Sequence, residues 1–260
     1  MVAQRTGEGA AQRATVAAAA RQTIPQTCGD APVVAVWTRT YERPERTARA
    51  TPLDDVVAGS RGYDIAKRAL DILGAGAGLA LLAPLFAVIA LCVKLEGHGS
   101  VIHRREIVGR DGATVAAYKF RTMIPNADEY LRAHPELLAE YSANIKLRRD
   151  PRITRMGALL RRTSLDELPQ LLNVLRGQMS LVGPRMIHPS EEPRYGALAT
   201  ARRRVRPGIT GLWQVSGRQD LSYEQRITLD RYYLSRRSFG FDLRILIATA
   251  GVLLRRDGAY

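Results

Sequence analysis

The sequence predicts a predominantly helical α+β fold, in which one membrane-inserted helix precedes a compact domain. The first observation is an apolar run of 25 residues, Ala69–Val93, whose only charged side chain is Asp71. The second is a pair of strand-like runs, Ser100–Ile107 and Thr114–Phe120, separated by a Gly-Arg-Asp-Gly turn signal. The third is that several later segments carry apolar residues at helical spacing.

The first 60 residues differ from the rest in composition. They are rich in Ala, Arg, Thr and Gln, and no hydrophobic period is sustained along them. We therefore predict that residues 1–60 form a polar, disordered extension, with an Ala-rich helix around residues 9–22 as the alternative. Residues 61–98 then form the membrane segment with its flanks, and residues 99–260 form the compact domain.

The apolar run is long enough to cross a bilayer, because about 20 apolar residues suffice. Two features oppose a simple span. Pro84 lies inside the run and would kink a helix, and basic residues flank both ends, whereas a span usually carries them mainly on its cytoplasmic side. These flanking residues are Arg61, Lys67 and Arg68 before the run, and Lys94, Arg104 and Arg105 after it. The residues alone favour neither a spanning nor a re-entrant helix, and a buried core helix is the alternative for a soluble protein.

The positive charge belongs to the second part of the chain. The net charge is +14, and residues 1–60 contribute only +1 of it, from seven arginines and six acidic residues. Such a field attracts nucleic acids, anionic lipids or phosphorylated substrates. The two cysteines, Cys28 and Cys92, predict neither a disulfide nor a zinc site. The four histidines (His98, His103, His134 and His188) lack metal-ligand spacing, so we interpret them as surface residues.

Four later segments have the pattern of helices. Ala127–Arg149 is charged and interrupted at Pro135, Gln170–Arg176 is short and precedes Gly177, and Tyr223–Arg237 is polar. Asp242–Arg256 is amphipathic, with a cationic end. Its apolar stripe suits either packing on the core or lying in a membrane interface.

The segment around Asp166 and Glu167 is the strongest candidate for chemistry. Both acids precede Pro169, which is tolerated in the first turn of a helix, so they mark a helix start. The helix dipole favours the ionised form there. An ionised Asp can act as a nucleophile or bind a hard cation such as Mg²⁺. The alternative is purely structural, because Ser164-x-x-Glu167 also matches a capping box.

Basic side chains near Gly/Pro-rich turns accompany this acid pair. Arginine presents a planar fork that matches phosphate oxygens, so these residues predict a diphosphate-binding site. The candidates are Lys119, Arg121, Arg161, Arg162, Arg185 and Arg206. Neither a phosphate-binding P-loop nor a dinucleotide-binding glycine motif is present.

The motifs together resemble the bacterial sugar transferases, also called monotopic phosphoglycosyl transferases. The resemblance covers Lys67 to Tyr260, about three quarters of the chain. It is carried by KRALD, YKFRTM, DPRITRMG, LRRTSLDELPQLLNVLRGQMSLVGPR, VRPGITGLWQVSGR and DLRILIATAGVLLRRDGAY. Two positions depart from the usual pattern: Met186 stands where the family commonly has Pro, and Ile107 stands where it commonly has Arg.

The resemblance implies a reaction and a topology. The apolar helix would be re-entrant and broken near Pro84, with a catalytic domain on the cytoplasmic face of the inner membrane and amphipathic interfacial helices. Asp166 would attack the sugar-linked phosphate of a UDP-sugar, releasing UMP, and undecaprenyl phosphate would then attack the covalent phosphosugar intermediate. Glu167 and Mg²⁺ would assist, and phosphates would be held by Lys119, Arg121, Arg161, Arg185 and Arg206.

The same resemblance defines the expected partners. They are a UDP-sugar, undecaprenyl phosphate and membrane lipid, and the pattern most resembles exopolysaccharide enzymes that use UDP-galactose or UDP-glucose. A homo-oligomer is compatible with the sequence. The basic charge alone would also suit a nucleic-acid-binding protein, but the apolar run and the lack of a recognition helix or aromatic platform argue against one. The intact acid pair argues against a non-catalytic scaffold.

Overall fold

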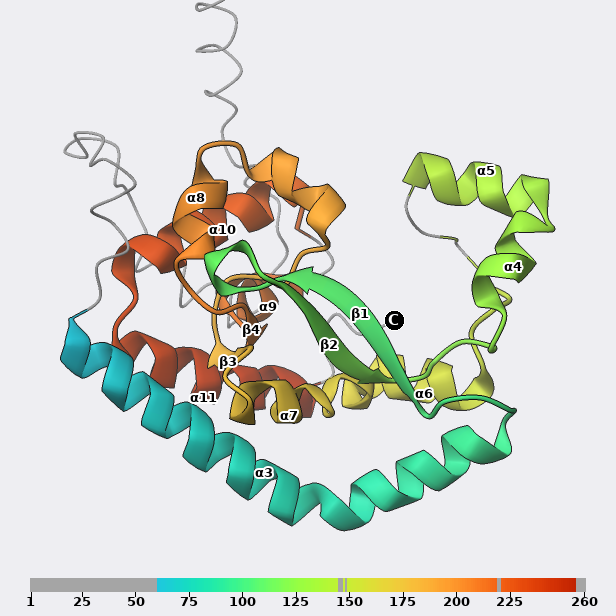
Figure 1. Ribbon diagram of the computed structural model, residues 1–260, viewed down its shortest axis with the longest axis horizontal. Helices are drawn as coiled ribbons and strands as arrows, with labels where there is room; N and C mark the ends of the chain where they lie inside the picture. The colour runs from blue at the N-terminus through green and yellow to red at the C-terminus, as the bar shows by residue number, and fades with distance from the viewer. Residues whose placement is uncertain (1–59, 145–146, 148, 219–220, 256–260) are drawn as a thin grey trace, which may run out of the picture. The chain divides into compact units, whose positions relative to one another are not determined.

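A computed structural model describes residues 60–255, except residues 145–146, 148 and 219–220. The extension predicted for residues 1–60 therefore lies outside the described residues, apart from Ser60, and so does Cys28. The described part is mostly helical with two small sheets, which confirms the α+β prediction (Figure 1). Its elements are α3 (Arg61–Leu95), β1 (Ile102–Val108), η2 (Arg110–Gly112), β2 (Thr114–Phe120), α4 (Ala127–Arg132), α5 (Pro135–Asn144), α6 (Arg155–Thr163), η3 (Leu165–Glu167), α7 (Gln170–Leu175), β3 (Ser180–Val182), η4 (Pro189–Tyr195), α8 (Leu198–Arg203), β4 (Gly208–Thr210), α9 (Leu212–Ser216), α10 (Tyr223–Arg236) and α11 (Phe239–Arg255).

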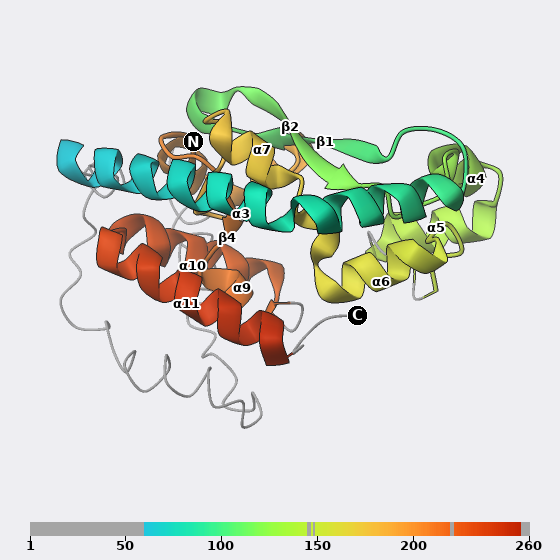
Figure 2. The ribbon, with the colours of Figure 1, turned by 90° about the horizontal axis from the view of Figure 1, so that it is seen from below.

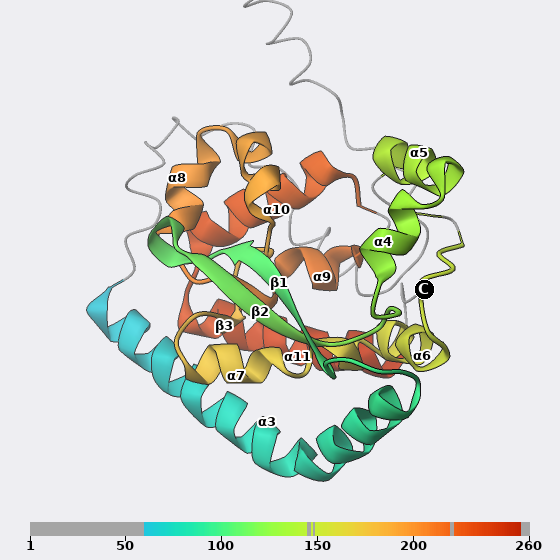
Figure 3. The ribbon, with the colours of Figure 1, turned by 45° about the vertical axis from the view of Figure 1, so that its right-hand side comes forward.

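Helix α3 contains the whole apolar run and begins earlier than its first apolar residue. The Ser60 side chain caps its N-terminus by accepting from the Tyr63 N–H, and the helix continues through Pro84 for 35 residues. It changes direction near its middle (Figures 1 and 3), as expected for a helix that carries an internal proline. Among the described residues, α3 is the one helix long and apolar enough to cross a membrane.

Helix α3 is attached to the rest of the fold near both of its ends. Near the N-terminus, Asp242 accepts hydrogen bonds from Tyr63 Oη (2.9 Å) and Lys67 Nζ (2.7 Å). At the C-terminal end, the guanidinium of Arg121 donates to the carbonyls of Val93, Gly97 and His98 at 2.6–2.9 Å. Both attachments come from residues that follow α3 in the chain, so the two ends of the helix contact the same domain.

Between these ends, a small residue and a buried acid hold α3 close to β3. Asp71 is 1% exposed and accepts hydrogen bonds from Ser180 Oγ (3.0 Å) and the Leu181 N–H (2.9 Å). A Cβ atom on Gly74 would lie only 2.7 Å from Leu181 Cδ1, so a larger residue there would require the Leu181 side chain to shift. The single charge in the apolar run is therefore a packing contact of the helix.

The two predicted strands form an antiparallel hairpin. β1 and β2 pair in the register His103↔Lys119 and Arg105↔Ala117, so these residues share one face of the hairpin. A second sheet, which the sequence did not predict, pairs β3 and β4 in parallel. Because the 25 residues between β3 and β4 include η4 and α8, this pairing joins segments that no local pattern connects.

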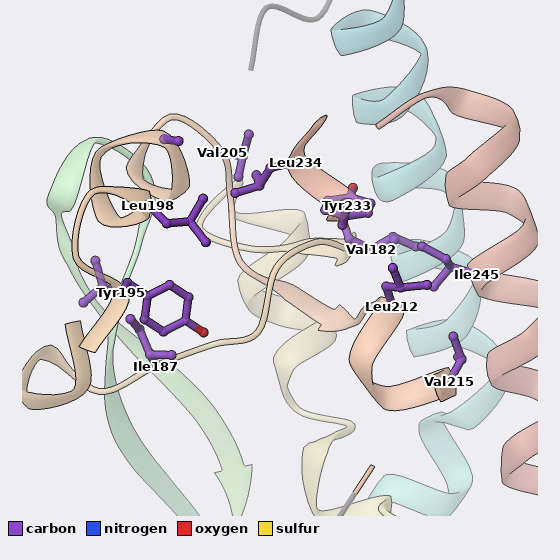
Figure 4. Close-up of a cluster of buried hydrophobic side chains, with 12 residues drawn as sticks. Val182, Ile187, Tyr195, Leu198, Val205, Leu212, Val215, Tyr233, Leu234 and Ile245 are labelled. Atoms are coloured by element: carbon purple, nitrogen blue, oxygen red, sulfur yellow. The ribbon is translucent and has the colours of Figure 1, made fainter. Parts of the chain in front are cut away.

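Three clusters of buried side chains form the core. The largest joins η4, α8, α9, α10 and α11, with Ile187, Leu198, Leu234 and Ile245 at 0–1% exposure (Figure 4). A second packs the hairpin on α7 and the first half of α3. The third packs Phe120 and Leu160 against the second half of α3. The hairpin and α6 therefore rest on the same helix that carries the apolar run.

The predicted helices are present, with boundaries set by local residues. Ala127–Arg149 divides into α4 and α5, and α5 begins at Pro135. α7 ends just before Gly177, whose φ of 76° suits glycine. On α11, Ile245 and Val252 are buried, whereas Leu243, Ile247 and Leu253 of the predicted stripe are exposed. The stripe therefore does not simply pack on the core, and α11 runs beside α3 (Figure 2).

Candidate active site

A sharp turn presents the acid pair. α6 ends at Thr163, the next residue, Ser164, adopts a left-handed conformation (φ 57°), and η3 begins directly after it. Positive φ is uncommon for residues other than glycine, and strained residues of this kind cluster at functional sites. The Ser164 side chain makes no capping hydrogen bond to η3, so the capping-box alternative is wrong. The Glu167 carboxylate instead has a partner on the hairpin.

That partner is Lys119, near the end of β2. Its Nζ lies 2.5 Å from Glu167 Oε1 and 3.7 Å from Asp166 Oδ2. The two acids and the lysine are about one third exposed or less, so the ammonium acts in a partly desolvated space. The structure thus brings together three of the residues predicted from the sequence.

Burial dominates the electrostatics of Asp166. Its side chain is mostly buried, and burial raises its pKa above the usual value. The Lys119 charge opposes this increase, and the neighbouring Glu167 carboxylate adds to it. The sequence-based expectation that a helix start favours the ionised form is therefore outweighed by desolvation.

Arg161 joins the same site from α6. A Cβ atom on Gly157 would lie 2.1 Å from the Thr122 carbonyl oxygen, so glycine allows α6 to pack directly on the chain that leaves β2. Arg161 Nε donates to Thr122 Oγ1 at 2.9 Å. Its charge acts on Asp166 and lowers the pKa of that carboxyl, although less than Lys119 does.

Arg185 is fixed beside the same face of the hairpin. Its Nη1 lies 2.7 Å from Glu191 Oε2, and the other oxygen of Glu191 lies 3.4 Å from Arg105 Nη2. The guanidinium also lies over the rings of Trp213 and Tyr223, 5.7 and 5.6 Å from their centroids. Because Arg105 and Lys119 share a hairpin face, Arg185 lies on the side of the hairpin that carries the acid pair.

The buried Asp230 holds the backbone of Arg185 in place. It accepts from the Arg185 N–H (3.1 Å) and from Tyr195 Oη (2.9 Å). Complete burial raises the pKa of Asp230 to about 6, although hydrogen bonding from Arg185 and the charge of Arg202 oppose the increase. Sequence reasoning did not select Asp230, because nothing in a polar helix marks one carboxylate as buried.

The structure places the other two predicted phosphate-binding residues apart from the acid pair. Arg121 donates to three carbonyls at the end of α3, and a phosphate contact would have to replace these hydrogen bonds. Arg206 donates from Nε to the Gly177 carbonyl (2.6 Å), and the charged groups that act on it are Arg110, Arg68, Asp71 and Asp64.

Two further residues near the acids were not selected from the sequence. His103 lies opposite Lys119 in the hairpin and is exposed, which confirms its interpretation as a surface residue, and partial desolvation together with the Lys119 charge lowers its pKa. Gln170 is fully buried one helical turn after Asp166, and neither of its amide atoms has a hydrogen-bond partner among the described residues. Buried amides are normally satisfied, so Gln170 is a candidate contact for a substrate or a water molecule.

The carboxylates of the acid pair are also the ligands that this site could provide to a metal ion. The described residues contain no group of three or more His, Cys, Asp or Glu side chains that could enclose one. Mg²⁺, however, is commonly bound by one or two carboxylates together with substrate phosphates. Asp166 and Glu167 supply two adjacent carboxylates that already attract a cationic group, so the donor set fits Mg²⁺.

Comparison with known proteins places this arrangement in a family. The bacterial sugar transferase family model matches residues 62–256. The UDP-galactose-lipid carrier transferase of Erwinia amylovora is 47% identical over 75% of this chain. The exopolysaccharide production protein ExoY of Rhizobium meliloti is 41% identical over 84% of this chain, and the UDP-glucose:undecaprenyl-phosphate glucose-1-phosphate transferase of Caulobacter vibrioides is 40% identical over 76%.

The matches differ in how much of each relative they cover. The aligned part is 41% of the Erwinia protein, 73% of the Caulobacter protein and 94% of the Rhizobium protein. The chain thus spans less than half of the first of these relatives and nearly all of another. The family match includes α3, the hairpin and the acid pair. On this evidence the chain belongs to the bacterial sugar transferase family.

Proposed function

We propose that this protein transfers hexose-1-phosphate from a UDP-sugar to undecaprenyl phosphate, as a first membrane step in exopolysaccharide synthesis. The observation that carries the proposal is the contact of Lys119 with both Asp166 and Glu167, within the part of the chain that matches the family. It combines an anionic nucleophile with a cation where phosphate charge would accumulate.

The first displacement uses Asp166 as the nucleophile. One carboxylate oxygen attacks the phosphorus that carries the sugar, and the bond from this phosphorus to the bridging oxygen breaks. UMP leaves with that oxygen, and the sugar phosphate is joined to Asp166 as an acyl phosphate. Lys119 and Arg161 lie beside the acids and stabilise the charge that moves onto the leaving phosphate.

The second displacement regenerates the enzyme. A phosphate oxygen of undecaprenyl phosphate attacks the same phosphorus, the acyl phosphate bond breaks, and Asp166 returns to a carboxylate. The product is a polyprenyl diphosphate sugar. When bound between Asp166, Glu167 and substrate phosphates, Mg²⁺ would supply further charge neutralisation. We infer that Arg185, fixed by Glu191, and Gln170, whose buried amide has no partner among the described residues, orient the substrate.

The attachment of α3 at both ends supports a re-entrant topology. Tyr63 and Lys67 bind Asp242, and the helix end binds Arg121. A straight span would place these two ends on opposite faces of the membrane, whereas one domain contacts both. We infer that α3 enters and leaves through one face, with the bend near its middle, and that the domain lies in the cytoplasm.

Exposed apolar side chains support an interfacial position for other helices. Leu159 on α6, Leu172 on α7 and Ile247 on α11 are 40–66% exposed. These helices lie on the side of the domain that faces α3 (Figures 1 and 2). Exposed apolar faces next to a membrane helix would be buried in the lipid interface.

The sugar is proposed to be galactose or glucose. The Erwinia relative is named for UDP-galactose, and the Caulobacter relative is named for UDP-glucose. The decisive experiment measures UMP release by the purified full-length protein with undecaprenyl phosphate and a panel of UDP-sugars, with and without Mg²⁺. Asp166→Asn is the matched inactive control. No UMP release with any UDP-sugar, from folded protein with Mg²⁺ present, would contradict the proposal.

A further inference from the structure

A cationic cavity lies at the turn end of the hairpin. Its volume is about 330 Å³, and it is formed by the first turns of α3, η2, the segment between α8 and β4, and the end of α10. The cationic side chains that line it are Lys67, Arg68, Arg110, Arg204, Arg206 and Arg237. Three carboxylates also line it, so the cations outnumber the acids by three.

This cavity is separate from the acid pair. Neither Asp166, Glu167 nor Lys119 lines it. The hairpin runs from its turn, at the cavity, to its open end beside α6 (Figure 1). Along β2, the five residue-to-residue steps from Thr114 to Lys119 correspond to about 17 Å. The cavity is therefore a second site of positive charge in the domain.

Several of its guanidinium groups are held close together. The guanidinium groups of Arg68 and Arg206 both approach Gly177. If this residue carried a Cβ atom, the atom would lie 3.6 Å from Arg68 Nη2 and 3.9 Å from Arg206 Nη2. Arg68 is fixed by hydrogen bonds to the Val174 and Leu175 carbonyls (2.7 and 2.8 Å), and Arg206 by one to Gly177. Burial and the charges of Arg110 and Arg68 lower the pKa of Arg206, so the groups repel one another.

The acids of the cavity do not fully relieve this repulsion. Asp71 already accepts hydrogen bonds from Ser180 and Leu181. The other two acids pair with arginines at longer distances: Asp64 lies 3.9 Å from Arg237, and Asp111 lies 3.6 Å from Arg110. The last two distances are long for charge-assisted hydrogen bonds. The guanidinium groups of Arg68 and Arg206 are held by their hydrogen bonds to backbone carbonyls and carry more N–H donors than those bonds use. In a hollow of this size they form a site for an anion with several oxygens, such as a phosphate group.

Exposed apolar side chains that adjoin the cavity without lining it indicate that the phosphate belongs to an amphiphile. Asp64, Lys67, Arg68 and Asp71 follow one face of α3 at helical spacing. Beside them on the same turns, Ile65, Ile72 and Leu73 are 44–71% exposed. A ligand could place its phosphate among the arginines and its hydrocarbon chains along these apolar residues.

We propose that this cavity binds the phosphate headgroup of a membrane lipid, as a second lipid site apart from the catalytic acids. The inference rests on the membrane association in the proposed function and not on the transfer reaction. The recognised group is a phosphate that carries a hydrocarbon chain, and both an anionic phospholipid and a polyprenyl phosphate supply it. Such a lipid would anchor the domain beside the first turns of α3.

Native mass spectrometry of the delipidated full-length protein in detergent tests this inference. The probes are phosphatidylglycerol, undecaprenyl phosphate, inorganic pyrophosphate, and diacylglycerol as a phosphate-free amphiphile. The key variant is Arg110→Ala, because Arg110 is exposed and, within the described part of the chain, its ion pair is with the exposed Asp111, so the fold should persist. Arg206→Lys keeps the charge but removes the planar fork, and Arg231→Ala on the exposed face of α10 is the charge-matched control.

We expect retention of a phosphate-bearing lipid, and about tenfold weaker retention in Arg110→Ala. Arg206→Lys should also weaken lipid retention. Arg231→Ala should retain the lipid as the wild type does, and the protein should not retain diacylglycerol. Comparison of the two lipid probes identifies which headgroup is preferred. Equal lipid retention by the wild type and Arg110→Ala, or binding of pyrophosphate without binding of either lipid, would overturn the inference. Because the readout is binding, its failure would leave UMP release unaffected as a separate test of the transfer reaction.

Discussion

The ammonium of Lys119 lies 2.5 Å from the carboxylate of Glu167, although 47 residues separate them in the chain. The same ammonium lies 3.7 Å from Asp166, so one cation from the hairpin serves both acids of η3. This contact links the strand motif YKFRTM to the acid motif SLDELPQ in a single site. Its consequences for charge and rate can be measured.

Removing the Lys119 charge should move the acid limb of the pH–rate profile upward. In the proposed mechanism Asp166 must be ionised to attack, and burial already raises its pKa above the usual 3.8. Lys119 is the main group that opposes this increase, so Lys119→Met should raise the pKa of Asp166 further. The rate at low pH should then fall more than the rate at high pH. The measurement is kcat/KM for UMP release against pH.

Lys119→Arg provides the control for this experiment, because it keeps the positive charge. Its acid limb should lie near that of the wild type even if its maximal rate is lower. An acid limb in Lys119→Met that stays in place or moves to lower pH would show that Lys119 does not set the ionisation of the nucleophile.

Arg185 should contribute strongly to catalysis through its fixed guanidinium. Glu191, Trp213 and Tyr223 hold this group beside the hairpin face that carries Lys119. Arg185→Ala should lower kcat/KM by roughly 10²-fold, because a positioned charge-assisted contact to phosphate is lost. Arg185→Lys should recover only part of the activity, since a lysine lacks the planar fork.

Arg231→Ala is the matched control, because Arg231 is an exposed arginine on α10. It should retain nearly full activity. If Arg185→Ala and Arg231→Ala reduced kcat/KM equally, the general positive field of the domain, rather than a specific site, would explain the effect. Thermal unfolding of both variants shows whether either loss reflects misfolding.

Asp230 should make the stability of the domain depend on pH. Its pKa is about 6 in the folded protein, against 3.8 for an ordinary Asp. The folded state therefore favours the protonated carboxyl. The stability that this preference contributes is fully present below pH 3.8 and is lost as the pH rises through about 6.

Asp230→Asn removes this titration while it keeps an oxygen that can accept from Arg185 and Tyr195. Relative to this variant, the wild type should lose up to about 3 kcal/mol of unfolding free energy between pH 4 and pH 7. Denaturant unfolding at several pH values in detergent measures the difference. Asp128→Asn, at an exposed position on α4, is the control. A wild-type advantage over Asp230→Asn that grows with pH would contradict the assignment.

Cysteine labelling can determine the topology of α3. In a background that lacks Cys28 and Cys92, Ala50→Cys reports on the chain before α3, and Glu136→Cys reports on α5. If α3 is re-entrant, an impermeant maleimide should label neither site in intact cells and both sites after lysis. Labelling of position 50 from outside, with position 136 protected, would show that α3 spans the membrane.

Local patterns in the sequence determined the elements that carry the site. The length and composition of the apolar run predict α3, and the turn residues between two alternating segments predict the hairpin. Pro169 predicts a helix start beside the acids, and Gly177 predicts the end of α7. These features were readable because periodicity and turn chemistry act over a few neighbouring residues.

Other features could not be read from local patterns. The parallel pairing of β3 with β4 has no local signal, because its two strands are brought together by packing of the intervening helices. The burial of Asp230 and Gln170 likewise depends on elements distant in sequence. A polar residue on a short helix looks the same in the sequence whether it faces solvent or the core.

By itself, the sequence determined the long apolar helix, the hairpin, the acid pair Asp166 and Glu167, and the excess of basic residues around them. Only the tertiary structure decided which of those basic residues lie beside the acids and which lie elsewhere in the domain. It places Lys119, Arg161 and Arg185 on the side of the acids, Arg121 at the end of α3, and Arg206 in a separate cavity with Arg68 and Arg110. The physical reason is that a side chain's charge is visible in the sequence, whereas its partner and its burial depend on the packing of elements far apart in the chain.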